Sequence, residues 1–132
     1  MNADIETLVR YRFERAFESH EEARVLYELK HVNACVNRLY YAAFYAISGA
    51  LLAMGKSSTK HSGIRALFHR HLVRTGRVPV ELGKLVDKLF DSRQKGDYAD
   101  LVRFEPSVVS PWMAPTRSLI DLLESTTFTH ET

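Results

Sequence analysis

The chain has 132 residues, of which 45% are hydrophobic and 26% are charged, a composition typical of one folded globular domain. This apolar content excludes a disordered chain, and the single cysteine excludes an internal disulfide. The net charge of +2 conceals an uneven distribution: residues 1–29 carry −3, residues 30–80 carry +8 without any Asp or Glu, and residues 81–132 carry −3.

The first predicted element is an amphipathic helix of about 25 residues, because its apolar side chains recur at helical spacings. Asp4 and Glu6 lie near its N-terminus, where the helix dipole favours negative charge. After a turn near Lys30, residues 32–54 form a second predicted helix. This helix is apolar on nearly every side, which is typical of a helix that others surround.

Residues 60–74 are predicted to form a third helix. Gly76 ends that helix, and Pro79 begins a fourth one at a position that tolerates proline. The fourth helix ends close to Gly96. After a loop, the last helix is predicted to start at Pro111.

Five helical segments with short connections predict an all-α protein, an up-and-down bundle of four to five helices. We expect one domain whose core spans about residues 4–125, since no linker or internal repeat interrupts the pattern. The longest apolar stretch is too short to span a membrane, and the N-terminus has no signal pattern. The expected location is therefore the cytoplasm.

The acid-free centre of the chain has two interpretations of about equal weight. Its arginines and lysines can attract phosphates, which favours a nucleotide or RNA ligand. Alternatively, the basic helices pair with the acidic first and fourth helices inside the fold.

Sequence patterns for metal or cofactor binding are absent: there is no paired-cysteine zinc spacing, no Gly-rich phosphate loop and only one Glu-x-x-His segment. We therefore expect no metal and no cofactor. Cys35 lies among apolar positions of the second helix and is expected to be a core thiol.

Polar residues interrupt the most apolar helix. Arg38, Tyr41 and Tyr45 are spaced three and four residues apart and therefore share one face. The chemistry of these residues favours a buried network that fixes helix register, with Asp97 or Asp100 as the partner of the arginine. The alternative is the wall of a cleft in which arginine binds phosphate and tyrosine stacks on a base.

A second polar segment ends the fourth helix. Arg93 continues the apolar stripe of that helix and should point inward, and Asp97 and Tyr98 follow at the helix end. The group is either an ion-paired helix terminus or a phosphate-binding element.

Three segments together carry a family resemblance. They are Asn37-Arg38-x-Tyr40-Tyr41-Ala42-x-Phe44, Lys60-His61-Ser62-Gly63 with Phe68, and Arg93-x-x-x-Asp97-Tyr98. Their order and separation resemble one branch of the HEPN superfamily, the higher-eukaryote and prokaryote nucleotide-binding domain. The resemblance extends over about residues 8–123.

The resemblance implies a four- to five-helix bundle that commonly forms homodimers. It also implies a small prokaryotic protein encoded beside a minimal nucleotidyltransferase, as in toxin–antitoxin pairs. HEPN ribonucleases act without a metal and carry an arginine, a polar neighbour and a histidine four to six positions later. Arg93 and Gln94 match the first two, but no histidine follows, so Asp97, Tyr98 or His61 would have to substitute.

Three hypotheses follow. The first is a HEPN protein that binds a nucleotide or RNA and acts with a nucleotidyltransferase partner; its binding residues are Asn37, Arg38, Tyr41, Lys60, His61 and Arg93. The second is a metal-independent endoribonuclease toxin; its catalytic residues are Arg93, Asp97 and Tyr98. The third is a structural dimer or adaptor without a ligand.

Overall fold

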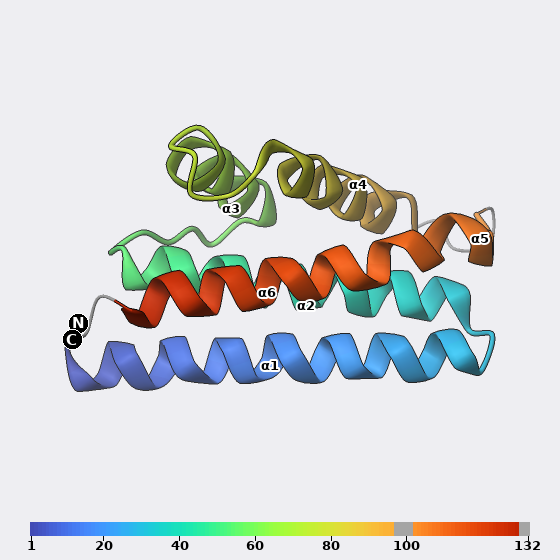
Figure 1. The fold of residues 1–132 in the computed structure, drawn as a ribbon, viewed down its shortest axis with the longest axis horizontal. Helices are drawn as coiled ribbons and strands as arrows, with labels where there is room; N and C mark the ends of the chain where they lie inside the picture. The colour runs from blue at the N-terminus through green and yellow to red at the C-terminus, as the bar shows by residue number, and fades with distance from the viewer. Residues whose placement is uncertain (97–101, 130–132) are drawn as a thin grey trace.

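The computed structural model describes residues 1–96 and 102–129, and its longest helices lie side by side (Figure 1). The elements in chain order are α1 (Ala3–Glu28), α2 (Val32–Ala53), α3 (His61–Phe68), the π-helical turn η1 (His69–Val73), α4 (Val80–Gly96), α5 (Pro106–Val109), the 3-10 turn η2 (Ser110–Trp112) and α6 (Met113–Phe128). No strand occurs in the described ranges, so the prediction of an all-α bundle is confirmed. None of the described helices is both long and apolar enough to cross a membrane.

The long helices alternate in direction. In Figure 1, α1 runs from the end that holds both termini, α2 returns beside it, α4 runs outward again above them, and α6 returns across the front. The side chain of Asn2 caps α1 by accepting a hydrogen bond from the backbone N–H of Ile5 at 2.8 Å. Lys30 adopts a φ of 68° in the tight turn between α1 and α2. This arrangement is the up-and-down topology that the sequence predicts.

The second helix is the centre of the bundle. It packs against α1, α3, α4 and α6, and 13 of its 22 residues are buried. Cys35 is fully buried among them, and burial raises the pKa of its thiol to about 11. The predictions of a surrounded second helix and of a core thiol are therefore confirmed.

The third predicted helix is not uniform. Residues 61–68 are α-helical, whereas His69–Val73 widen into a π turn. Gly83 of α4 packs closely against this turn. A Cβ atom at position 83 would lie only 3.1 Å from a methyl group of Val73. Helix periodicity alone does not encode this close approach, so the sequence predicted one continuous helix.

The last helical region begins earlier than predicted. Pro106 starts α5, and Pro111 lies in the 3-10 turn that connects α5 to α6. Proline lacks an N–H and its ring clashes with the preceding helical turn, so Pro111 interrupts the region instead of opening its main helix. The main helix of this region, α6, begins at Met113, two residues after the start that the sequence predicted at Pro111.

Helices α1 and α2 pack closely at Gly49. A Cβ atom at this position would lie 3.2 Å from Cε2 of the buried Phe13. We predict that Gly49→Val lowers the free energy of unfolding by about 1–3 kcal/mol through overpacking. The exposed Ala34 of the same helix is the matched control, and Ala34→Val should cost less than about 1 kcal/mol. Urea denaturation measures both, and equal effects would contradict the prediction.

Candidate functional site

A polar strip lies on the partly exposed face of α2. The guanidinium carbon of Arg38 is 4.9 Å from the ring centroid of Tyr41, and the rings of Tyr41 and Tyr45 are 6.1 Å apart. All three side chains are partly exposed. The shared face that the spacing predicts is therefore present, and a ligand can reach it.

The favoured interpretation of this strip as a buried network was wrong. Asn37 is exposed, and the side chain of Arg38 retains 26% of its accessible surface. Arg38 donates two hydrogen bonds to the side-chain amide oxygen Oδ1 of the neighbouring Asn37, at 2.7 and 3.1 Å. Its guanidinium also lies 4.0 Å from the carboxylate of Glu22 in α1. A helix at the centre of a bundle still exposes one strip where no other helix covers it.

Helix α4 brings Arg93 to the same strip. Its guanidinium carbon is 5.0 Å from the Tyr40 ring centroid and 5.8 Å from that of Tyr41, and a terminal nitrogen is 3.4 Å from the Tyr41 hydroxyl. The predicted inward direction of Arg93 is confirmed. Two arginines from different helices thus approach the ring of Tyr41.

The first residue of α3 completes the group. Nδ1 of His61 is hydrogen-bonded to the hydroxyl of the fully buried Tyr40, and the imidazole stacks on Phe44 with centroids 4.3 Å apart. We call Arg38, Tyr40, Tyr41, Phe44, His61 and Arg93 the arginine–aromatic cluster. Helices α2, α3 and α4 all contribute to it.

A tight turn holds His61 in place. The hydroxyl oxygen of Ser58 accepts a hydrogen bond from the backbone N–H of Lys60 at 3.2 Å. The same oxygen would lie 2.0 Å from a Cβ atom at Gly63, so only glycine leaves room for it. The Ser58 side chain therefore packs onto the first turn of α3, where His61 begins the helix.

Burial and charge both act on the histidine. Desolvation lowers the pKa of His61, and the positive charge of Arg93 lowers it further. At neutral pH the imidazole is therefore uncharged. Its Nδ1 is hydrogen-bonded to the Tyr40 hydroxyl, whereas no hydrogen bond joins Nε2 to another residue in the described parts of the chain. Nε2 is thus the nitrogen that can exchange a proton with a ligand.

Three more residues belong to the predicted site, namely Lys60, Asp97 and Tyr98. Lys60 is the exposed N-cap residue of α3, next to the cluster in sequence, and its backbone N–H donates a hydrogen bond to the Ser58 hydroxyl. Asp97 and Tyr98 lie outside the described residues, as does Asp100. The site prediction did not include Tyr40 and Phe44, although their spacing of four residues places them on one helix face.

The basic centre of the chain is partly neutralised inside the fold. Arg65 of α3 forms ion pairs at 2.9 Å with Asp87 and Asp91 of α4, and His69 contacts Asp87 at 2.8 Å. These contacts match the interpretation in which basic and acidic helices pair. Arg38, in the same basic centre, is instead hydrogen-bonded to Asn37 and lies beside the ring of Tyr41, with Glu22 4.0 Å away.

Comparison with known proteins identifies relatives of the chain. A family model described as "HEPN domain" matches residues 9–126. A UPF0332 protein of Thermotoga maritima is 41% identical over 119 residues, which cover 90% of each chain. Two Methanocaldococcus jannaschii proteins, each named "Putative toxin", are 32% and 31% identical. The first match covers 64% of this chain and 58% of the relative, and the second covers 74% and 73%.

The arrangement of His61 and Arg93 predicts a measurable coupling. We expect the His61 imidazole to titrate below its ordinary value of 6.5 in an NMR pH titration, and Arg93→Gln to raise its pKa. The matched control is Arg70→Gln, which should instead raise the pKa of His71, a histidine that Arg70 affects in the same way. An unchanged His61 pKa in Arg93→Gln would contradict the coupling.

The same shift predicts how stability depends on pH. His61 binds its proton more weakly in the folded protein than in the unfolded chain. Its contribution to the free energy of unfolding is therefore complete above about pH 6.5 and is lost as the pH falls below that value. The free energy of unfolding of the wild type should therefore fall faster between pH 6.5 and 5 than that of His61→Gln.

Proposed function

This chain belongs to the HEPN domain family, and we propose that it is a toxin-like member that binds nucleotide units, as RNA or a free nucleotide, at the arginine–aromatic cluster. One observation carries the proposal. The guanidinium carbons of Arg38 and Arg93 lie 4.9 and 5.8 Å from the ring centroid of Tyr41, on a face that is partly open to solvent.

This combination suits the two parts of a nucleotide. A guanidinium group binds a phosphate through paired hydrogen bonds, and a tyrosine ring stacks on any base. The Tyr45 ring continues the aromatic surface, with its centroid 6.1 Å from that of Tyr41. Successive bases of a strand can therefore stack on successive rings. Such a site binds single strands with little sequence preference, because every base has a flat face.

Removing the ring should weaken binding more than removing a remote charge. We predict that Tyr41→Ala raises the Kd for a fluorescein-labelled single-stranded RNA of twelve nucleotides by about 5- to 100-fold. Arg38→Gln should weaken binding and reduce the slope of log Kd against log salt concentration by about 0.7, the loss of one phosphate contact. Fluorescence anisotropy measures both effects, and competition with free ATP or AMP separates RNA from nucleotide as the ligand.

The control is an exposed arginine of the same basic stretch outside the cluster. Arg74→Gln removes one positive charge but touches none of the cluster residues. If it weakens RNA binding as much as Arg38→Gln does, the basic surface binds RNA diffusely and the proposed site is wrong. If neither RNA nor nucleotide binds the wild type, the ligand-free adaptor becomes the better hypothesis.

The His61–Tyr40 hydrogen bond favours ribonuclease activity as a second candidate function. An uncharged imidazole lies close enough to Arg93 for the arginine to lower its pKa, although no histidine follows Arg93 at the usual offsets. In this candidate, Nδ1–H of the neutral imidazole donates to the Tyr40 hydroxyl, and Nε2 removes the proton from a ribose 2′-hydroxyl, whose oxygen attacks the adjacent phosphate. The 5′-oxygen leaves with a proton from water, and Arg93 stabilises the charge that develops on the phosphate.

Cleavage of a labelled RNA in the presence of EDTA tests this candidate. If the wild type cuts, His61→Ala should slow cleavage by about 100-fold or more and Arg93→Ala by a similar factor. His71→Ala is the matched control, since the pKa of His71 is also lowered but its contacts lie outside the cluster. Full activity of His61→Ala would eliminate His61 as the proton carrier, and Asp97 and Tyr98 would be the next residues to vary.

Two partners belong to the proposal. The first is a second copy of the chain, and the second is a minimal nucleotidyltransferase encoded next to it. The relatives named as toxins support a paired system of this kind. Co-expression with the product of the neighbouring reading frame, followed by size-exclusion chromatography, tests the second partner.

A further inference from the structure

A row of side chains, all exposed except the partly buried Arg15, follows one side of α1 and ends at its C-cap residue Leu29. Its members recur at alternating intervals of three and four residues, which is the spacing of the side chains that pack between two helices. We call them the α1 stripe: Leu8, Tyr11, Arg15, Glu18, Glu22, Val25 and Leu29. Four of the seven large apolar side chains exposed in the described ranges belong to it.

The exposure of these four is substantial. Leu8 and Val25 are 41% and 40% exposed, whereas Tyr11 and Leu29 reach 54% and 61%. Single exposed apolar residues are ordinary, but a row of them on one helix face marks an interaction surface. Another helix is the element that matches such a row in shape.

The order of residue types along the stripe indicates what covers it. Two apolar residues lie at its N-terminal end, two lie at its C-terminal end, and charged residues occupy the middle. A second α1 helix that runs in the opposite direction places apolar ends on apolar ends. It also places Arg15 of each copy beside Glu22 of the other, whereas Glu18, which pairs with Arg15 of its own helix at 2.7 Å, lies near the two-fold axis.

We propose that the α1 stripe is the surface on which a second copy of this chain docks, with the two α1 helices antiparallel about a two-fold axis. This inference deepens the homodimer of the proposed function by assigning its interface. The same patch serves on both copies, which is the arrangement that closes a dimer.

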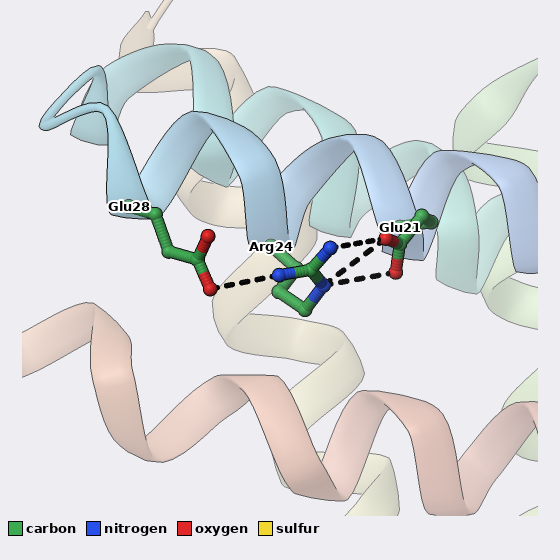
Figure 2. Close-up of polar contacts among 3 residues, drawn as sticks. All are labelled: Glu21, Arg24 and Glu28. Atoms are coloured by element: carbon green, nitrogen blue, oxygen red, sulfur yellow. Dashed lines mark hydrogen bonds and ion pairs between the residues drawn. The ribbon is translucent and has the colours of Figure 1, made fainter.

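An ion-paired ladder borders the stripe. Figure 2 shows Arg24 between Glu21 and Glu28 on α1, with ion pairs to both; the contact with Glu28 is 2.7 Å. These charges are paired within their own helix and remain about half exposed or more. They supply the polar rim that surrounds the apolar part of most interfaces.

On its other side the stripe meets the arginine–aromatic cluster. The guanidinium carbon of Arg15 is 5.4 Å from the Tyr45 ring centroid, and Glu22 lies 4.0 Å from Arg38. In the dimer, Arg15 of the second copy competes with Arg38 for Glu22. Docking therefore releases Arg38 toward a phosphate, and the proposed site becomes more cationic when the dimer forms.

Sedimentation velocity without RNA tests the surface. The wild type should sediment as a dimer, and Tyr11→Glu should raise the dimer Kd by at least about 30-fold. The control is Val108→Glu, because Val108 is 52% exposed but lies outside the stripe. Its dimer should be unchanged. A monomeric wild type would overturn both the homodimer and this interface, whereas a dimer that resists Tyr11→Glu would overturn the interface alone.

Charge reversal tests the complementary middle. Arg15→Glu and the double variant Glu18→Arg/Glu22→Arg should each be monomeric at concentrations where the wild type is dimeric. Mixed together, they should form a heterodimer, because every opposed pair is then of opposite sign. Circular dichroism establishes that each variant is folded. Failure of the folded variants to associate on mixing would overturn the charge pairing.

The direction of the helices is a separate measurement. A spin label at Thr7→Cys, beside the stripe, should report a label-to-label distance of about 35 Å in the dimer, from the rise of 1.5 Å per residue. A parallel pair would bring the labels to about 10 Å and overturn the antiparallel arrangement. The native Cys35 does not interfere, because it is fully buried.

Discussion

The position of α2 at the centre of the bundle is the constraint on which the other features depend. Helices α1, α3, α4 and α6 cover most of its surface, so a charged side chain on it is costly unless it reaches the one uncovered strip. Arg38, Tyr41 and Tyr45 occupy this strip. The neighbouring helices then determine which residues join them, namely His61 from α3 and Arg93 from α4.

This constraint also explains how much of the site the sequence predicts. The spacing of Arg38, Tyr41 and Tyr45 gives their common face, since residues within one helix keep a fixed geometry. The stripe of α4 gives the inward direction of Arg93. The meeting of His61 with Tyr40 depends on how α3 docks on α2, which no local spacing encodes. For the same reason the helices are predicted from the sequence, whereas the π turn, which packs closely against Gly83, is not.

Burial was the weaker part of the prediction. An arginine in an apolar helix suggests a buried ion pair, and Asp97 or Asp100 was the expected partner. The side chain of Arg38 instead stays 26% exposed, with Tyr41 and Asn37 as its near neighbours and Glu22 at 4.0 Å. Aromatic faces and an amide oxygen can hold a guanidinium without neutralising it. An arginine held in this way keeps its charge available to a ligand, whereas one in a close ion pair does not.

The same distinction divides the basic centre of the chain. Arg65 is held by two carboxylates at 2.9 Å and serves to fix α3 on α4. The guanidinium carbon of Arg38, by contrast, lies 4.9 Å from the Tyr41 ring centroid, and its ion pair with Glu22 is longer, at 4.0 Å. The +8 charge of residues 30–80 is therefore not one uniform surface for phosphate. Part of it stabilises the fold, whereas Arg38 lies on the partly exposed strip where a ligand can reach it.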